Sequence, residues 1–283
     1  MRERAIADLD QLPDNRFFQE VAAGLQHVAE NAITIDSDAC ALGNQDRPRG
    51  ERILRAIAEE EAAKYLILLD AVRCQRGGSR RLAAHLVRFN QHLAKGLYAN
   101  CCELRPATFG ELRAWIDRDR EQYYLDGPND IDWIFRNSIL QQREESFYVD
   151  YVENDGEHSW QSPQHNDRLR FGTFYKWSPA VIRLVTDLDA CGFSDERALA
   201  LVAEKWRPVE ITDECHFMTL RTLNYETLKA LEAANILREK LDDVYRRIVD
   251  EWGFPLYSLD LGEIKIPQAG LRERQERWTP DNW

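Results

Sequence analysis

Residues 79–98 carry two neighbouring stripes of side chains at helical spacing, and this pattern constrains the fold more than any other segment. On a helix, which turns about 100° per residue, five basic or imidazole side chains fall on one narrow stripe. They are Arg81, His85, Arg88, His92 and Lys95. The adjacent apolar stripe consists of Leu82, Leu86, Phe89, Leu93 and Leu97. The segment predicts a single helix whose cations and imidazoles form either a solvated flank or the wall of a polar site.

Residues 50–74 predict a partner for these cations. Their apolar helical stripe also contains two charged side chains, Glu60 and Lys64. A buried charge is costly unless it is paired and hydrogen-bonded. We therefore expect the Glu60 carboxylate to bind a cation or imidazole of the 79–98 helix, either Arg88 or His92, while Lys64 balances Glu60.

Helical periodicity continues through most of the chain, so the expected fold class is all-α. The predicted helices span residues 15–31 (with an extension towards 41), 50–74, 79–103, 108–119, 131–146, 179–190, 194–205, 213–233 and 236–252. Residues 147–152 are aromatic and β-branched, which favours an extended conformation. We expect a helical bundle over residues 1–152, a linker or irregular segment over 153–177 and a helical C-terminal extension over 178–283. The tail after residue 252 is mostly polar and is expected to dock poorly, or on a partner.

The composition is typical of a globular chain, with 44% hydrophobic and 30% charged residues. No apolar run approaches the ~20 residues of a membrane span. The N-terminus lacks the apolar core of a secretory signal, so we expect a cytoplasmic protein with no membrane partner. Six scattered cysteines without a Cys-x-x-Cys pair indicate free structural thiols rather than zinc ligands or disulfides.

The charge distribution narrows the class of ligand. A formal net charge of −12 disfavours broad, non-specific binding of nucleic acid. Residues 76–105 nevertheless contain six basic side chains and a single acidic one, Glu103. A basic strip within an acidic chain suits a confined anionic ligand better than a long duplex.

Three blocks of the sequence point to a known family. They read RAIAEEEAAKYLILLDA at residues 55–71, FNQHLAKGLYA at 89–99 and QQREESFYVDYVENDG at 141–156. Their order and spacing resemble those of the AbiV-like abortive-infection proteins, which belong to the wider HEPN group. The resemblance covers residues 18–152 and implies an up-and-down four-helix HEPN bundle that forms a homodimer, in a phage-defence role.

The resemblance also implies a type of chemistry. Many HEPN proteins are metal-independent ribonucleases in which an arginine, four to six intervening residues and a histidine meet their counterparts at the dimer interface. In this chain only three residues separate Arg88 from His92. Arg80 and His85 have the four-residue gap, but they lie in a block that matches less well.

Cleavage of RNA requires a proton acceptor for the 2′-OH, stabilisation of the phosphate charge and a proton for the leaving oxygen. His92 is the candidate acid or base, and Arg88 is the candidate phosphate clamp. The residues assigned to catalysis are Arg88, His92, Lys95, Glu60 and Lys64, and those assigned to substrate binding are Arg81 and His85. These roles require neither a metal ion nor a cofactor.

The same residues also fit a structural role. Glu–Lys pairs four residues apart commonly stabilise helices, and Arg and Lys often flank an apolar face with their charged ends in water. Two functions therefore stay open. The first is a cytoplasmic phage-defence protein whose homodimer cleaves RNA or otherwise halts gene expression. The alternative is a non-catalytic HEPN-like module that binds a phage or host protein, or a nucleotide.

Overall fold

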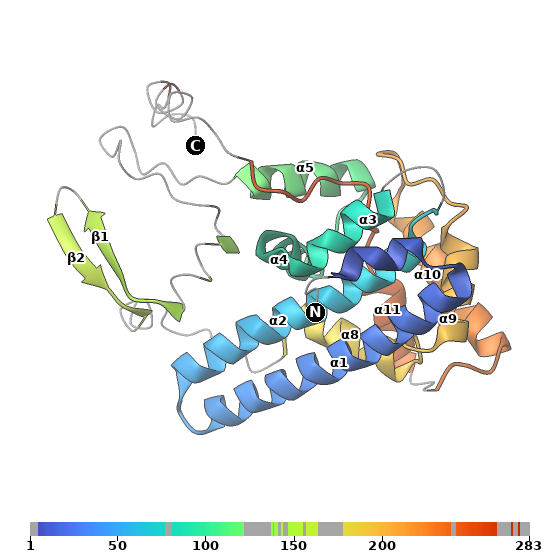
Figure 1. The fold of residues 1–283 in the computed structure, drawn as a ribbon, viewed down its shortest axis with the longest axis horizontal. Coiled ribbons are helices and arrows are strands. Elements are labelled where there is room, and N and C mark those ends of the chain that lie inside the picture. The colour runs from blue at the N-terminus through green and yellow to red at the C-terminus, as the bar shows by residue number, and fades with distance from the viewer. Residues whose placement is uncertain are drawn as a thin grey trace.

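Two long helices joined by a short turn, α1 (Asp14–Asn44) and α2 (Pro48–Arg73), form the centre of the fold (Figure 1). The structure is a computed structural model that describes residues 5–76, 81–121, 137, 139–140, 143, 147–154, 157–163, 178–238, 242–264, 273 and 277. Asp46 in the turn has a positive φ of 56°. Pro48 is the first residue of α2, a position that does not need a backbone N–H donor.

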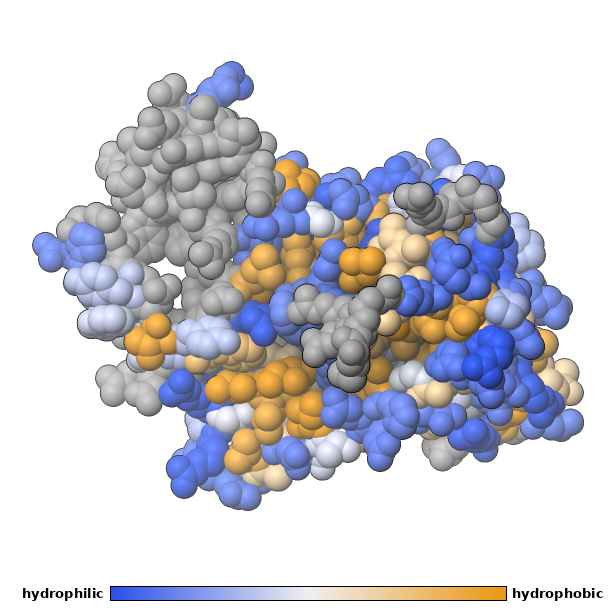
Figure 2. All heavy atoms as spheres, viewed as in Figure 1, coloured by the Kyte–Doolittle hydropathy of each residue, from blue (hydrophilic) through white to orange (hydrophobic). Residues whose placement is uncertain are grey.

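α1 is longer than its strongest apolar stripe predicts. The expected helix ended near residue 31, with an extension towards 41, whereas α1 continues to Asn44. Ala32, Asp36 and Ala39 prolong the buried stripe at helical spacing, so the second half of the helix also packs inward. Ile33 and Ile57 are 37% exposed, and Figure 2 shows apolar residues gathered over the left-hand part of α1 and α2.

The single helix predicted over residues 79–103 is wrong. The chain forms a short helix α3 (Arg81–Leu86), a 3-10 turn η2 (Val87–Asn90) and a separate helix α4 (His92–Cys101). Gln91 lies between them with an extended backbone, at φ −101° and ψ 119°. The break turns the side chains before it and after it towards different parts of the molecule.

The helix α5 (Phe109–Glu121) begins where the sequence predicts, and the 3-10 helix η1 (Ala5–Gln11) precedes α1. The Thr108 hydroxyl accepts the backbone N–H of Glu111 at 3.2 Å, which caps the first turn of α5. The Glu111 carboxylate reaches back and accepts the N–H of Ala107 at 2.7 Å. The helix predicted at 131–146 falls mostly outside the described residues.

A β-hairpin follows, formed by β1 (Asp150–Asn154) and β2 (Glu157–Gln161) in antiparallel register. The expected extended conformation of residues 147–152 is confirmed from Asp150 onward. Residues 157–161, which we expected in an irregular linker, instead form the second strand. The Asp-Gly pair at 155–156 is a hairpin signal that the polar composition of this stretch obscured.

The C-terminal helices are α8 (Ala180–Ala190), α9 (Glu196–Trp206), α10 (Phe217–Ala233) and α11 (Asp242–Glu251). Their predicted positions are confirmed, although α10 and α11 begin later than expected. They share one hydrophobic core with α1 and α2. The Tyr65 hydroxyl of α2 lies 3.1 Å from the Ser194 hydroxyl, and the Gln26 amide of α1 donates to the Ser194 carbonyl at 2.9 Å. The domain boundary at residue 152 stays a prediction.

The expectation of a poorly docked tail is wrong for the residues that directly follow α11. The segment 253–261 is packed into the core, and its buried side chains are Phe254, Leu256, Tyr257, Leu259 and Leu261. Side chains from the N-terminal half hold its backbone. Asp70 accepts the N–H of Leu256 at 2.7 Å, and Arg73 donates to the carbonyl of Gly253 at 3.0 Å. We call residues 253–261 the C-terminal strap.

Candidate functional site

Three basic or imidazole side chains converge on the carboxylate of Glu60. His92 Nδ1 lies 2.9 Å from one carboxylate oxygen and 3.0 Å from the other. Lys95 Nζ donates to Glu60 at 2.5 Å, and Arg143 Nε donates at 3.1 Å. We call Glu60, His92, Lys95 and Arg143 the Glu60 cluster. The prediction that Glu60 binds His92 on a neighbouring helix is confirmed.

Two packed helices and one later segment bring the cluster together. Glu60 lies in the middle of α2, which packs against α4. His92 begins α4 and Lys95 follows three residues later, so both side chains face the same way. Arg143 comes from the chain after α5, and its guanidinium lies over the Phe147 ring at 5.1 Å from the centroid.

The four side chains of the cluster differ in exposure, from the buried Lys95 to the accessible His92. Lys95 is 6% exposed, Glu60 20%, Arg143 27% and His92 45%. Burial alone would raise the pKa of Glu60. The hydrogen bonds and charges of Lys95 and His92 outweigh this effect and hold the pKa below its ordinary value. The carboxylate stays ionised at neutral pH, and the two cations exceed its charge. The cluster can therefore hold an imidazole in place beside a net positive charge.

Arg88, the predicted phosphate clamp, does not lie in this cluster. Its guanidinium donates to the carbonyl of Leu256 at 2.7 Å and to the carbonyl of Leu259, both in the C-terminal strap. An unbroken helix would have placed Arg88 and His92 on one face. The extended residue Gln91 breaks the helix and separates the two side chains. The resemblance-based pairing of Arg88 with His92 is therefore wrong for this structure.

His85, assigned to substrate binding, is fully buried. Its Nε2 lies 2.8 Å from the carbonyl of Ile67, and its Nδ1 lies 3.3 Å from an Arg88 nitrogen. A neutral imidazole satisfies both contacts, with Nε2–H donating and Nδ1 accepting. Burial lowers the pKa of His85 to about 4, so the ring is neutral at physiological pH. No substrate can reach it in this packing, and the assignment is wrong.

Arg81, the other predicted substrate-binding residue, is exposed at the start of α3. Its charge acts on the Cys74 thiol, just beyond the end of α2. Cys74 follows Glu60 by fourteen residues, which corresponds to about 21 Å of helix. The structure therefore does not bring Arg81 together with the Glu60 cluster.

Lys64 does not balance Glu60 as predicted. Its Nζ donates to the carboxylate of Glu61, which is the residue after Glu60 in α2. The same ammonium group lies over the Phe89 ring, 5.1 Å from its centroid. The positive charges that balance Glu60 come from other elements, Lys95 of α4 and Arg143.

Arg143 is the cluster member that reasoning from the sequence missed as a site residue. Its sequence position, eighty-three residues from Glu60, contains no periodic signal that links the two. The only available signal was its place within the block 141–156 that carries the family resemblance.

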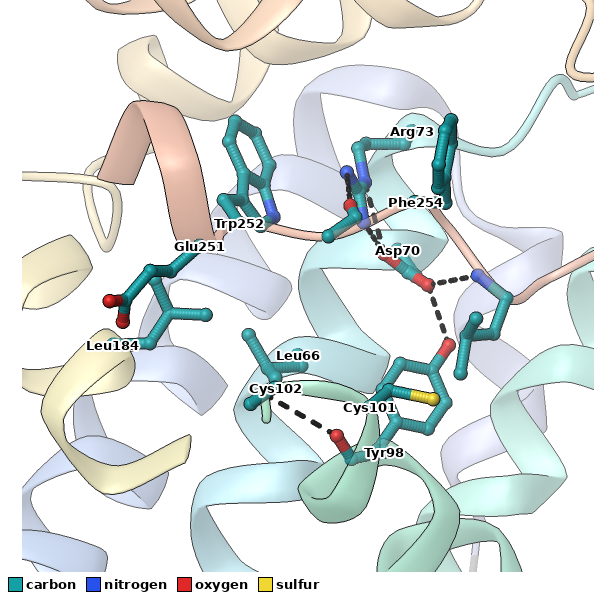
Figure 3. A pocket seen from close by; sticks show the side chains of 12 residues that line it. Leu66, Asp70, Arg73, Tyr98, Cys101, Cys102, Leu184, Glu251, Trp252 and Phe254 are labelled. Atoms are coloured by element: carbon teal, nitrogen blue, oxygen red, sulfur yellow. Dashed lines mark hydrogen bonds and ion pairs between the residues drawn. The ribbon is translucent and has the colours of Figure 1, made fainter. Parts of the chain in front are cut away.

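A second polar group is buried where α2 meets the C-terminal strap (Figure 3). Asp70 and Arg73 form an ion pair within α2, with side chains 1% and 3% exposed. The Tyr98 hydroxyl donates to Asp70 at 2.6 Å, beside the bond from the Leu256 amide. These bonds join α2 to α4 and to the C-terminal strap, so the network ties elements together.

A small cavity of about 30 Å³ lies beside this network, and it can hold no more than a few water molecules. Two thiols line it, Cys101 and Cys102. Burial raises the pKa of Cys102 to about 12 and the pKa of Cys101 well above its ordinary value. Both sulfurs therefore stay protonated, which argues against a nucleophilic role.

Among the residues that the structure describes, no group of three or more His, Cys, Asp or Glu side chains has an arrangement that could hold a metal ion. No described helix has both the length and the apolar character of a membrane span. The Glu60 cluster is thus the polar site whose chemistry fits the predicted activity best.

The comparisons with known proteins identify the family. The family model HEPN_AbiV, described as AbiV, matches residues 20–170, which is more than half of the 283 residues. No curated protein and no solved structure matches the chain. The match spans α1 to the hairpin and so includes every residue of the Glu60 cluster. AbiV proteins are abortive-infection proteins, which indicates a phage-defence role. The chain belongs to the AbiV family of HEPN proteins.

Proposed function

We propose that this protein acts in the cytoplasm as a ribonuclease that needs no metal ion, with the Glu60 cluster as its active site. The observation that carries the proposal is the accessible His92 imidazole, which is held by a carboxylate beside two cations. An imidazole whose Nδ1–H donates to a carboxylate keeps its Nε2 lone pair for a proton, as a general base requires. Lys95 and Arg143 supply the positive charge that a phosphate needs.

The proposed reaction is transfer of a phosphodiester to the neighbouring ribose oxygen. Nε2 of His92 takes the proton of the 2′-OH, and the 2′ oxygen attacks the phosphorus. The bond from phosphorus to the 5′ oxygen breaks, and that oxygen takes a proton from a second, protonated imidazole. The products are a 2′,3′-cyclic phosphate and a 5′-OH, so atoms and protons balance. Lys95 and Arg143 stabilise the charge that develops on the phosphoryl oxygens.

A homodimer would provide the second imidazole. The HEPN fold dimerises commonly, and two copies that face each other through α4 would bring two His92 rings to one phosphate. One ring then acts as the base and the other as the acid. In this proposal Arg143 takes the phosphate-binding role that the sequence assigned to Arg88.

Cleavage of total RNA by the purified protein in EDTA tests the proposal. We expect the wild type to produce fragments with 2′,3′-cyclic phosphate ends, and His92→Ala to lower the rate by about 10²–10⁴-fold, the usual contribution of a general acid or base. His27→Ala is the matched control, because His27 is an exposed histidine on α1 and outside the cluster. Equal cleavage by wild type and His92→Ala would remove His92 from the mechanism.

A specific contact favours a second function. Arg88, which would complete the usual HEPN motif, is engaged by the carbonyls of the C-terminal strap. A HEPN-like module without that arginine in its site could act by binding a protein or nucleotide partner instead. No cleavage by either wild type or His92→Ala, in a preparation with native helical content, would support this alternative.

A further inference from the structure

The β-hairpin presents an aromatic face to solvent. Tyr151 lies directly opposite Trp160 in the antiparallel register, with ring centroids 4.9 Å apart. Because side chains alternate between the two sides of a strand, His158 shares this side with Trp160, and its ring stacks on Tyr151 at 5.7 Å. Trp160 is 73% exposed and Tyr151 is 54% exposed. We call Tyr151, His158 and Trp160 the aromatic face of the hairpin.

Further exposed side chains lie directly before the hairpin in the chain. Tyr148 and Val149, which lead into β1, are both 56% exposed. Tyr148 packs edge-on against Phe147, whose ring lies under Arg143. Exposed groups of aromatic residues of this kind mark interaction surfaces, and Trp and Tyr dominate the binding energy of protein interfaces.

The hairpin is also incomplete as a sheet. Its two strands pair only with each other among the described residues, which leaves one backbone edge of each strand without a strand partner there. In Figure 1 the hairpin stands apart from the helices. A two-stranded hairpin is only marginally stable in water, and unpaired edges accept further strands. An added strand would stabilise the hairpin and cover its edge.

The charge of the segment selects the type of strand. Residues 147–161 contain four acidic residues and no lysine or arginine. The acidic residues are Asp150, Glu153, Asp155 and Glu157. Aromatic rings attract cations through their electron-rich faces. Tryptophan is the ring that binds most strongly, and arginine is the cation found most often. The acidic sequence and the aromatic face therefore both favour a basic ligand.

We propose that the hairpin is a docking arm for an extended, arginine- or lysine-rich segment of a protein partner. The segment adds a third strand at an edge of the hairpin, and its cationic side chains lie on the rings of Tyr151 and Trp160. This inference goes beyond the proposed ribonuclease and does not depend on it, because none of its residues belongs to the Glu60 cluster.

The same observations disfavour two other occupants. RNA could stack its bases on the aromatic face, but the acidic sequence of residues 147–161 would repel its phosphates. A second copy of the chain that paired hairpin to hairpin would bring two acidic segments together, and like charges across strands are destabilising. A basic polypeptide meets neither obstacle.

Binding of short fluorescent peptides, followed by anisotropy, tests the proposal with the full chain. The probe alternates arginine with valine, and a matched peptide replaces each arginine with glutamate. We expect the basic peptide to bind, with an affinity that falls as salt rises, and the acidic peptide not to bind. A basic peptide N-methylated at alternate residues lacks the donors for a strand edge and should bind at least tenfold more weakly.

Trp160→Ala is the decisive variant, since so exposed a side chain contributes little to the fold. We expect it to weaken binding of the basic peptide by about tenfold and to leave helical content and RNA cleavage as in the wild type. Tyr225→Ala is the control, because Tyr225 is an exposed aromatic residue on α10 (47% exposed).

Three outcomes would overturn the proposal. Unchanged binding by Trp160→Ala would place the peptide elsewhere. Tighter binding of oligouridylate than of the basic peptide, lost in Trp160→Ala, would make the hairpin a nucleic-acid surface. Self-association that Trp160→Ala abolishes, without peptide binding, would make it a contact between copies.

Discussion

Two aspartate–arginine pairs with the same three-residue spacing lie in opposite environments. Asp70 and Arg73 are almost completely buried, whereas Asp243 and Arg246 are 78% and 74% exposed. Exposed pairs contribute roughly 0–1 kcal/mol, while removal of one partner from a buried pair costs about 3–5 kcal/mol. The difference arises because the remaining buried charge has neither water nor a counter-ion.

We therefore expect Asp70→Asn to lower the free energy of unfolding by about 3–5 kcal/mol, since Arg73 keeps its charge in the core. Asp243→Asn is the matched control and should change it by less than about 1 kcal/mol. Urea unfolding of the three proteins at neutral pH measures both values. Equal stability of Asp70→Asn and the control would show that Arg73 is solvated.

A buried histidine and a half-buried glutamate give the protein opposing responses to acid. Burial lowers the pKa of His85 from 6.5 to about 4, so as pH falls through this range the unfolded chain takes up a proton that the folded chain refuses. Stability from His85 is thus lost on acidification. Burial, with the nearby charge of Glu103, raises the pKa of Glu59 from 4.5 to about 7. Here the folded chain takes up the proton first, so acidification adds stability.

Single variants should reveal each response. In Glu59→Gln, stability should fall more steeply than in the wild type between pH 7 and pH 4.5, because His85 acts alone. In His85→Gln, stability should instead rise as the pH falls, because Glu59 acts alone, and the missing contribution of His85 corresponds to about 3 kcal/mol. Urea unfolding across this pH range measures the slopes. Identical slopes in all three proteins would contradict the burial of both groups.

At the scale of elements, the break between η2 and α4 determines which residues meet. The local periodicity of residues 79–98 is that of one helix, yet Gln91 is extended. Arg88 before the break binds the C-terminal strap, and His92 after it binds Glu60. Long-range hydrogen bonds and packing override local propensity here, because a continuous helix could not satisfy both sets of partners. The hairpin shows the converse, since a local signal for it, the Asp-Gly pair at 155–156, was present in a stretch whose polar composition led us to expect an irregular linker.

At the scale of the molecule, the C-terminal strap completes the core. It buries five large side chains, and each is worth about 1.5–3 kcal/mol when removed from water. The total stability of a domain is only about 5–15 kcal/mol. The strap also supplies the groups that satisfy Asp70, Arg73 and Arg88.

A chain that ends at residue 252 should therefore lose cooperative unfolding, whereas one that ends at 264 should melt as the full chain does. Thermal unfolding followed by circular dichroism compares the three proteins. The chain ending at 264 serves as the control for the deletion itself. A normal melting transition in the shorter chain would show that the strap is dispensable for the core.

The sequence by itself determined the helical fold class, the positions of most helices, the inward-facing Glu60 and the family, because these depend on local periodicity and on short blocks of residues. It also indicated that either Arg88 or His92 would face Glu60. Only the tertiary structure decided which cations reach that carboxylate. Arg88 and Arg143 carry the same side chain, but Arg88 binds the carbonyls of the strap, whereas Arg143, from the segment after α5, binds Glu60. That choice depends on contacts between residues far apart in the chain, and neither helical spacing nor composition encodes it.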